Sequence, residues 1–132
     1  PAMNRLISSK FSIALSAALI LLALFVKPAL LAAHAYPAVS MPNNGAIVRE
    51  APRELRIQFT EGVELAFSQI TVKATNGEIV SQGKLRQLSN DTLAIDLKPL
   101  GAGNYSVEWQ VLSLDTHVTD GRLRFTIAAP VK

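Results

Sequence analysis

The sequence predicts an all-β protein: one antiparallel β-sandwich of about seven strands with Greek-key or Ig-like connections, preceded by an N-terminal signal peptide. Three observations support this. Beyond residue 34, apolar and polar residues alternate in short runs, which is the period of a half-buried strand. Turn-forming residues separate these runs at intervals near ten residues, a spacing typical of sandwiches. No helical period competes with the alternation.

Residues 1–33 have the three parts of a secretory leader. Arg5 and Lys10 give it a charged start, residues 11–26 form an apolar run of 16 residues, and residues 28–33 form a small-residue approach to a cleavage site. The apolar run is shorter than the ~20 residues that usually span a bilayer. We therefore expect a cleavable signal and no permanent membrane anchor.

The predicted domains are thus a signal peptide, residues 1–33, and a mature domain, residues 34–132. The first two residues are a cloning remnant or an upstream extension. Such a leader predicts export to the periplasm, but its pattern leaves the cleavage point open between the bond before His34 and the bond before Tyr36. Because the chain has no cysteine, the exported domain depends on its apolar core and not on disulfides.

The formal charge of +3 belongs to the leader. Of the 13 Lys and Arg residues, three lie in residues 1–33, which hold none of the 10 Asp and Glu residues. The other 99 residues therefore carry ten charges of each sign. Nucleic acid binding needs a positive field or a basic stripe, so the composition gives no reason to expect a nucleic acid partner.

The first half of the domain contains three predicted strands. Residues 35–42 form an edge-type segment between prolines, and the residues after it favour a turn. Residues 55–59 alternate apolar and polar side chains, and a loop at 61–64 follows. Residues 70–73 alternate again ahead of Asn76–Gly77, a dipeptide favoured in tight hairpins, so we expect residues 79–88 to return as the next strand.

The second half contains the clearest alternation. Residues 93–97 and 122–127 are predicted strands, and residues 105–111 place Tyr105 and Trp109 on one face between polar neighbours. Aromatic residues on the inward face of a central strand usually belong to the core. We expect this of both residues, with the Tyr105 hydroxyl bonded across a corner of the sandwich.

Asp115 and His117 are candidate metal ligands. They are two positions apart where a strand gives way to a turn, and residues i and i+2 of a strand share a face. His34, the other of the two histidines, would offer an amine and an imidazole if the leader were cut before it. Such nitrogen and oxygen donors suit copper(II), and because donors must lose protons to bind, affinity should fall with pH. Glu61 lies in an acidic loop that could end near the same rim.

These residues alone also allow an interpretation in which they bind no metal. His117 would then be a solvated turn residue with Asp115 as its hydrogen-bond partner, and His34 would leave with the leader. The function class that fits this interpretation is a metal-free Ig-like interaction module.

Several motifs together carry a family resemblance. They are His34 followed by Pro42 and Gly45, Phe59-Thr-Glu61-Gly-Val-Glu64, Gly103-Asn-Tyr-Ser-Val-Glu-Trp109, and Ser113-Leu-Asp-Thr-His117 leading to Gly121 and Phe125. In these residues the chain resembles the CopC family of periplasmic copper-binding proteins, including its YobA-like members. The resemblance covers essentially all of residues 34–132.

The resemblance implies a cupredoxin-like or Ig-like sandwich that binds one copper(II) ion through His34, Asp115 and His117. It places Glu61 near the metal, as a fourth ligand or just behind the ligands. Some relatives carry a methionine-rich loop for copper(I), but Met41 is the only methionine after the leader, so we expect no such site.

The resemblance also implies a function, a periplasmic copper carrier or buffer in copper resistance and homeostasis. Its implied partner is an inner-membrane copper transporter of the CopD type. We expect no enzymatic activity. The alternative enzyme would be a copper-dependent oxidative enzyme with an N-terminal histidine chelate, but a carboxylate beside the metal stabilises copper(II) against reduction.

Overall fold

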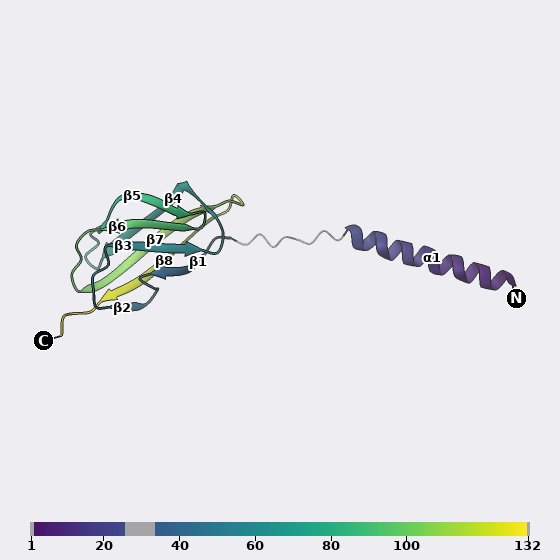
Figure 1. The fold of residues 1–132 in the computed structure, drawn as a ribbon, viewed down its shortest axis with the longest axis horizontal. Coiled ribbons are helices and arrows are strands. Elements are labelled where there is room, and N and C mark those ends of the chain that lie inside the picture. Colours follow the sequence, from purple (N-terminus) through teal and green to yellow (C-terminus); the bar gives the residue numbers. More distant parts are fainter. Residues whose placement is uncertain (1, 26–33, 132) are drawn as a thin grey trace. The chain divides into compact units, whose positions relative to one another are not determined.

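The computed structural model describes residues 2–25 and 34–131. The chain divides into two compact units, Pro1–Leu31 and Ala32–Lys132. In the first unit, α1 (Ala2–Phe25) is a helix of 24 residues rich in Ala and Leu, which are strong helix formers (Figure 1). Within the described residues, no helix combines the length and apolarity needed to cross a membrane. The predicted approach to the cleavage site, residues 28–33, lies outside the described residues.

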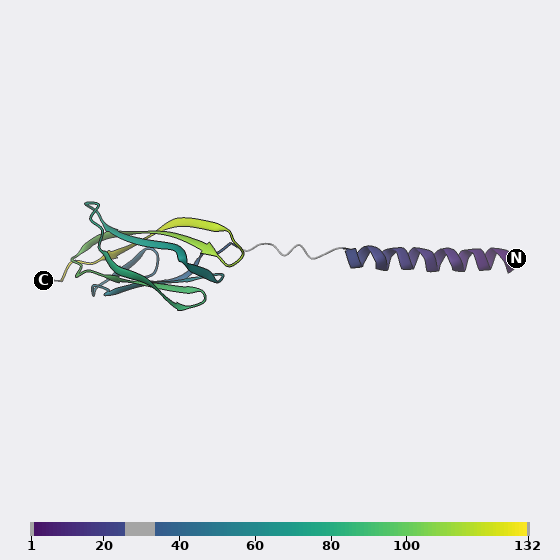
Figure 2. The same cartoon turned by 90° about the horizontal axis from the view of Figure 1, so that it is seen from above.

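The second unit forms two four-stranded sheets, with strand orders β1-β3-β6-β5 and β2-β8-β7-β4. Figure 2 shows them as two layers. The strands are β1 (Pro37–Met41), β2 (Ala46–Val48), β3 (Glu54–Phe59), β4 (Val63–Ala74), β5 (Ser81–Ser89), β6 (Thr92–Leu97), β7 (Gly103–Ser113) and β8 (Val118–Ile127). The predicted all-β sandwich is confirmed, and β1 is an edge strand as expected.

The alternation that predicted the strands is also the alternation of burial. In β3 every second residue is buried, ending at Phe59, and in β7 the buried positions include Tyr105 and Trp109. Both aromatic residues belong to the core cluster. The Tyr105 hydroxyl donates a hydrogen bond of 2.7 Å to the carbonyl of Gly101, so the predicted corner bond is confirmed.

Strand β2 was not predicted, and it makes one sheet mixed. Its three residues pair in parallel with β8, from Ala46 beside Phe125 to Val48 beside Ile127. A three-residue strand is too short to show an alternation in sequence. Two backbone bonds extend the pairing, from Gly45 N to the carbonyl of Arg124 and from Ala128 N to the carbonyl of Val48. The expected purely antiparallel sandwich is therefore corrected to one with a parallel edge.

The turn at Asn76–Gly77 forms, but it does not join neighbouring strands of one sheet. Strand β4 lies in one sheet and β5 in the other, and only the bridge between Lys73 and Ile79 pairs across the turn. Val80 then links the layers, because its N–H bonds the carbonyl of Val72 and its carbonyl accepts from Lys98 N. A turn motif specifies a local reversal and not the sheet that the returning chain joins.

Trp109 is packed against a glycine on the neighbouring strand. Gly121 of β8 lies opposite Trp109 of β7, and a Cβ at Gly121 would lie 2.7 Å from Trp109 Cζ2. The indole also contacts Phe59, with ring centroids 5.6 Å apart. Any side chain at position 121 would therefore push the indole against this packed core.

We expect Gly121→Ala to destabilise the fold by about 1–3 kcal/mol, the usual cost of overpacking. Urea unfolding followed by the fluorescence of the single tryptophan measures this change. Gly101→Ala is the matched control, because a Cβ there meets nothing within 4 Å, and its effect should stay within about 0.5 kcal/mol. Equal stability of the two variants would contradict the packing argument.

Candidate metal centre

Four segments that are distant in sequence meet at one end of the sandwich. They are residues 34–36, 60–62, 90–91 and 114–117, and backbone hydrogen bonds tie the other three segments to residues 60–63. Thr60 N bonds the carbonyl of Tyr36 at 2.8 Å, Val63 N bonds that of Asn90 at 2.9 Å, and Leu114 N bonds that of Gly62 at 3.0 Å. We call this end the site pole.

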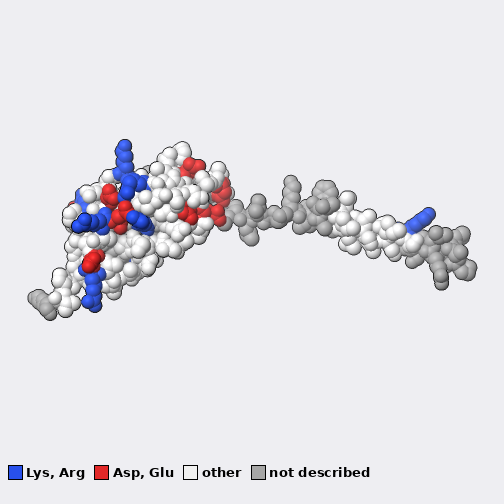
Figure 3. Space-filling model, viewed as in Figure 1, with Lys and Arg blue, Asp and Glu red and all other residues white. Residues whose placement is uncertain are grey.

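The site pole is acidic. Its four segments hold Glu61, Asp91 and Asp115 and no Lys or Arg, and Glu64 follows at the start of β4. In Figure 3 one end of the sandwich shows carboxylates without Lys or Arg beside them, whereas toward the other end carboxylates lie among Lys and Arg side chains. A surface with one sign of charge raises the local concentration of ions of the opposite sign. The site pole therefore favours cations.

Asp115 and His117 lie in the turn between β7 and β8. They were expected to converge because alternate strand residues share a face, but the turn itself brings them together. His117 Nδ1 lies 3.4 Å from Asp115 Oδ1, and the His117 N–H donates to the same oxygen at 3.3 Å. Between them Thr116 has a φ of 71°, a left-handed conformation that is costly for a β-branched residue. The turn is held in this form by the contacts around it.

Ser113 supports the turn from the core side. It is fully buried at the end of β7, and its hydroxyl donates to Asp115 Oδ1 and lies 3.0 Å from the carbonyl of His117. These interactions shift the titration of Asp115. The Ser113 hydroxyl first, and then the N–H and imidazole of His117, hold the pKa of the Asp115 carboxyl below its usual value. Asp115 is thus kept as a carboxylate, the form that binds metals.

His34 reaches this turn from the segment ahead of β1. Its ring centroid lies 4.6 Å from that of His117, with the rings tilted by 55°. Nδ1 of His34 is buried and has no hydrogen-bond partner among the described residues. A buried nitrogen without a partner is costly, so this atom is suited to bind a metal ion.

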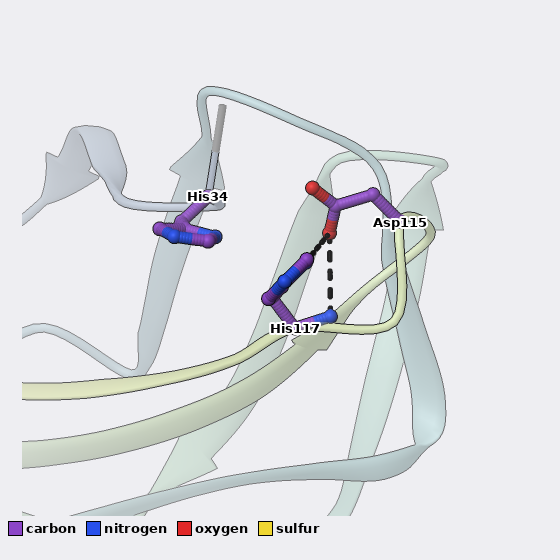
Figure 4. Close-up of side chains that lie close together, drawn as sticks. All are labelled: His34, Asp115 and His117. Carbon is purple, nitrogen blue, oxygen red and sulfur yellow. Dashed lines mark hydrogen bonds and ion pairs between the residues drawn. The ribbon is translucent and has the colours of Figure 1, made fainter. Parts of the chain in front are cut away.

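The three side chains point into one small space (Figure 4). One donor atom from each of His34, Asp115 and His117 lies within 4.8 Å of the other two. Two donors at ~2.0–2.1 Å from one zinc-sized metal ion lie at most ~4.2 Å apart. Shifts of less than ~1 Å would therefore bring all three donors onto one ion, so these residues fit the predicted metal.

Glu61 is placed differently. It is exposed in the connection between β3 and β4 and is not part of the three-residue group. The loop expected at 61–64 is also shorter than predicted, because β4 begins at Val63 and includes Glu64. The pairing of β4 is irregular between Glu64 and Gln69. The two-residue alternation that identifies a strand is therefore absent from this part of the sequence.

Sequence reasoning did not identify two threonines near His34. The Thr60 hydroxyl donates to the carbonyl of His34 at 3.2 Å, and the Thr119 hydroxyl donates to the carbonyl of Ala35 at 2.5 Å. Both bonds join segments far apart in the chain, and threonines are common on strands for other reasons. The one available signal is the position of Thr119, two residues after a candidate ligand, which could have suggested that it lies near the site.

Fold and site together define a class, a small β-sandwich with a cluster of two histidines and one aspartate at one pole. The cluster combines residues that lie far apart in the sequence. Residues 38–128 match the CopC domain family. The chain belongs to the CopC family.

Two curated relatives illustrate the family. The chain is 33% identical to Protein YobA of Escherichia coli strain K12 over 101 residues, covering 72% of this chain and 79% of YobA. It is 32% identical to Copper transport protein CutJ of Bacillus subtilis strain 168 over 112 residues, covering 83% of this chain but 21% of CutJ. The chain thus matches most of one relative and one segment of the other.

Solved structures of similar proteins share the sandwich. CopC from Methylosinus trichosporium OB3b matches with a TM-score of 0.66 and 27% identity, covering 75% of this chain and 98% of that one. PcoC, a methionine-rich copper resistance protein from Escherichia coli, matches with a TM-score of 0.64 and 28% identity, covering 72% and 99%. The family resemblance seen in the sequence is therefore confirmed in the fold.

We expect Ser113→Ala to raise the pKa of the Asp115 carboxyl toward its usual value, because the principal hydrogen bond that lowers it is lost. A lowered pKa means that the carboxylate stabilises the folded state above the usual pKa, and that this stabilisation is lost as pH falls through the lowered value. NMR titration of the carboxyl carbon in the metal-free protein measures the shift.

Ser89→Ala is the control for this titration. The Ser89 hydroxyl lies 2.8 Å from Asp91 Oδ1 and is the first cause of the lowered pKa of Asp91. Its loss should raise the pKa of Asp91 and leave Asp115 unchanged. An Asp115 titration that is the same with and without the Ser113 hydroxyl would show that the turn is held in another way.

Proposed function

We propose that this chain is a periplasmic protein that binds one copper(II) ion and acts as a carrier or buffer in copper resistance and homeostasis, and not as an enzyme. The observation that carries the proposal is the group of donors from His34, Asp115 and His117, each within 4.8 Å of the others. Two imidazoles and a carboxylate are donors that copper(II) prefers, and copper(II) binds such donors more tightly than other common divalent ions. Relatives named for copper transport and copper resistance support the choice of metal.

Processing before His34 completes the proposed site. Residues 1–33 act as the signal peptide, and their removal gives His34 a free amine beside its imidazole. The amine and Nδ1 of one histidine can close a six-membered chelate ring on a metal. The buried Nδ1 without a hydrogen-bond partner supports this, because it is the ring nitrogen that such a chelate uses.

Glu61 acts on the ion through its charge and not as a ligand. This assignment rests on its exposure and on its position outside the donor group. Together with Asp91 and Glu64 it makes the site pole negative, which speeds the arrival of a cation. The function of Glu61 in this proposal is therefore shared by its acidic neighbours.

The chain has no dedicated copper(I) site in this proposal. Soft thioether donors select copper(I), and Met41, the only methionine after the leader, is exposed on β1. PcoC, by contrast, is described as methionine rich. One isolated thioether cannot replace such a set of donors.

The proposed partner is an inner-membrane copper transporter of the CopD type. CutJ, a copper transport protein, matches this chain over 21% of its length. A CopC-like segment within a longer transport protein supports the idea that a separate CopC-like chain delivers copper to a transporter.

Substitution of the ligands tests the proposal. We expect His34→Ala, Asp115→Asn and His117→Ala each to weaken copper(II) binding at least ~10-fold, since each removes a donor. Competition titration of the exported protein against a copper chelator measures the affinity. Asp91→Asn and Glu61→Gln are controls that remove one charge at the same pole, and their effect should be smaller than that of Asp115→Asn. An unsubstituted protein that binds no copper would overturn the proposal and favour a metal-free interaction module.

The processed end provides a second test. N-terminal sequencing of the protein from the periplasm should show His34 as the first residue, and a form that retains Ala33 should bind copper(II) more weakly because the chelating amine has become an amide. Export with Tyr36 as the first residue would remove one of the three donors and contradict the proposed site.

A further inference from the structure

In the proposed copper site, one of the ligands lies at the very end of the processed chain. Chain ends are usually poorly ordered unless they are tied down. In the proposed processed form His34 is such an end, and a freely moving imidazole would lose conformational entropy on each binding event. The way in which residues 34–36 are held is therefore a property of the site itself.

Three successive carbonyls in this segment are all bonded by two threonines. The Thr60 hydroxyl donates to the carbonyl of His34 at 3.2 Å, and the Thr119 hydroxyl donates to that of Ala35 at 2.5 Å. Thr60 N donates to the carbonyl of Tyr36 at 2.8 Å. The Thr60 hydroxyl also accepts from Tyr36 N at 3.1 Å, so it uses both of its hydrogen-bonding functions.

The two threonines come from different sheets. Thr60 follows β3 in one sheet, and Thr119 lies on β8 in the other. Residues 34–36 thus bridge the open edge of the sandwich at the site pole. Thr119 is two residues after His117, so a single hydrogen bond connects the strand that follows one imidazole to the segment that carries the other. The ring separation of 4.6 Å between His34 and His117 is consistent with this coupling.

Burial makes the Thr119 bond important. Thr119 is 8% exposed and Ala35 is completely buried, so the Ala35 carbonyl has no access to water as a substitute donor. A buried carbonyl without a donor is costly. Thr60 is exposed, and its bonds can be exchanged for bonds to water.

We infer that Thr60 and Thr119 form a clamp that positions His34 for metal binding before the metal arrives. They are positioning residues, because neither lies in the donor group. This inference rests on the proposed function. It deepens that function by attributing the ordered position of His34 to the hydroxyls of Thr60 and Thr119. Preorganisation of this kind raises affinity by lowering the entropy lost on binding.

The test compares Thr119→Val with Thr119→Ser in the exported protein. Valine keeps the shape and removes the hydroxyl, whereas serine keeps the hydroxyl. We expect Thr119→Val to weaken copper(II) binding roughly fivefold to tenfold, the effect of losing about one hydrogen bond, and Thr119→Ser to remain close to the unsubstituted protein. The copper(II) EPR spectrum of Thr119→Val should retain the same donor set, because no ligand has been removed.

Hydrogen exchange of the metal-free protein provides a readout that does not depend on copper. In Thr119→Val the amides of Tyr36 and Thr60 should exchange faster, since both take part in holding the same segment. Thr126→Val is the matched control. Thr126 is also on β8, and its hydroxyl bonds the Asn104 side chain at 2.8 Å, so its loss should change neither copper affinity nor these two amides.

The possible outcomes separate the threonine clamp from the proposed copper site. Equal copper affinity of Thr119→Val and the unsubstituted protein overturns the clamp and leaves the copper site intact. Equal weakening by valine and serine also overturns it, because serine keeps the hydroxyl and the loss would then come from a general change in packing at this position. If Thr119→Val fails to fold, Thr60→Val at the exposed position takes its place, with a smaller loss in affinity, about twofold, and faster exchange of the Tyr36 amide expected, because water replaces part of its bonds; an unchanged affinity and unchanged exchange would overturn the clamp. Absence of copper binding in the unsubstituted protein overturns the proposed function instead, and the exchange experiment still reports on the clamp.

Discussion

Two threonine hydroxyls and one backbone N–H join residues 34–36 to both sheets of the sandwich. Without these bonds, the segment ahead of β1 would contribute only its side chains to the fold. With them, the segment closes the open edge between the sheets and buries Ala35 in the core. The geometry at His34 is therefore a consequence of how the sandwich is closed, and the rest of the site is arranged around this fixed point.

The opposite side of the site is held by a turn whose conformation is costly by itself. Thr116 adopts a positive φ, which a β-branched residue rarely does. Ser113 offsets this cost by bonding Asp115 and the backbone of His117 from a buried position. Strained residues held by their surroundings are frequent at functional sites. Here the strain lies between the two residues that face His34, which is where a defined orientation is needed.

The sequence was informative where a pattern is local. Alternation in β3 and β7 predicted both strands and their inward faces, and the Asp-x-His spacing predicted two of the three residues of the donor group. The sequence was not informative where interacting residues are far apart in the chain or where a strand is very short. The three residues of β2 pair with a strand some eighty positions away, and the bond between Thr119 and Ala35 joins residues 84 positions apart. No spacing rule relates such residues, because the pairing is created by the folded sheets.

The irregular start of β4 shows a different limit. The pairing shift between Glu64 and Gln69 breaks the two-residue period, so the segment looks like a loop in the sequence although most of it is strand. The expectation that Glu61 lies near the metal rested in part on this loop, and it stays a prediction. A loop running from 61 to 64 could have turned Glu61 toward the histidines, but a strand that begins at Val63 leaves Glu61 exposed in a short connection.

Exposure across the site follows a gradient that is consistent with the proposed role of a carrier. Nδ1 of His34 is buried, whereas the side chain of Asp115 is 34% exposed and that of His117 is 51% exposed. A metal enclosed on all sides would be held by desolvated donors and could leave only if the surrounding structure opened. At this pole the fixed donor lies on the inner side, and the solvent-accessible donors lie where an incoming acceptor could replace them one at a time. Stepwise replacement keeps each intermediate partly coordinated, so the barrier to transfer is lower than the barrier to complete release into water. In the proposed carrier, the order of burial among the three donors would therefore favour transfer between proteins over simple dissociation.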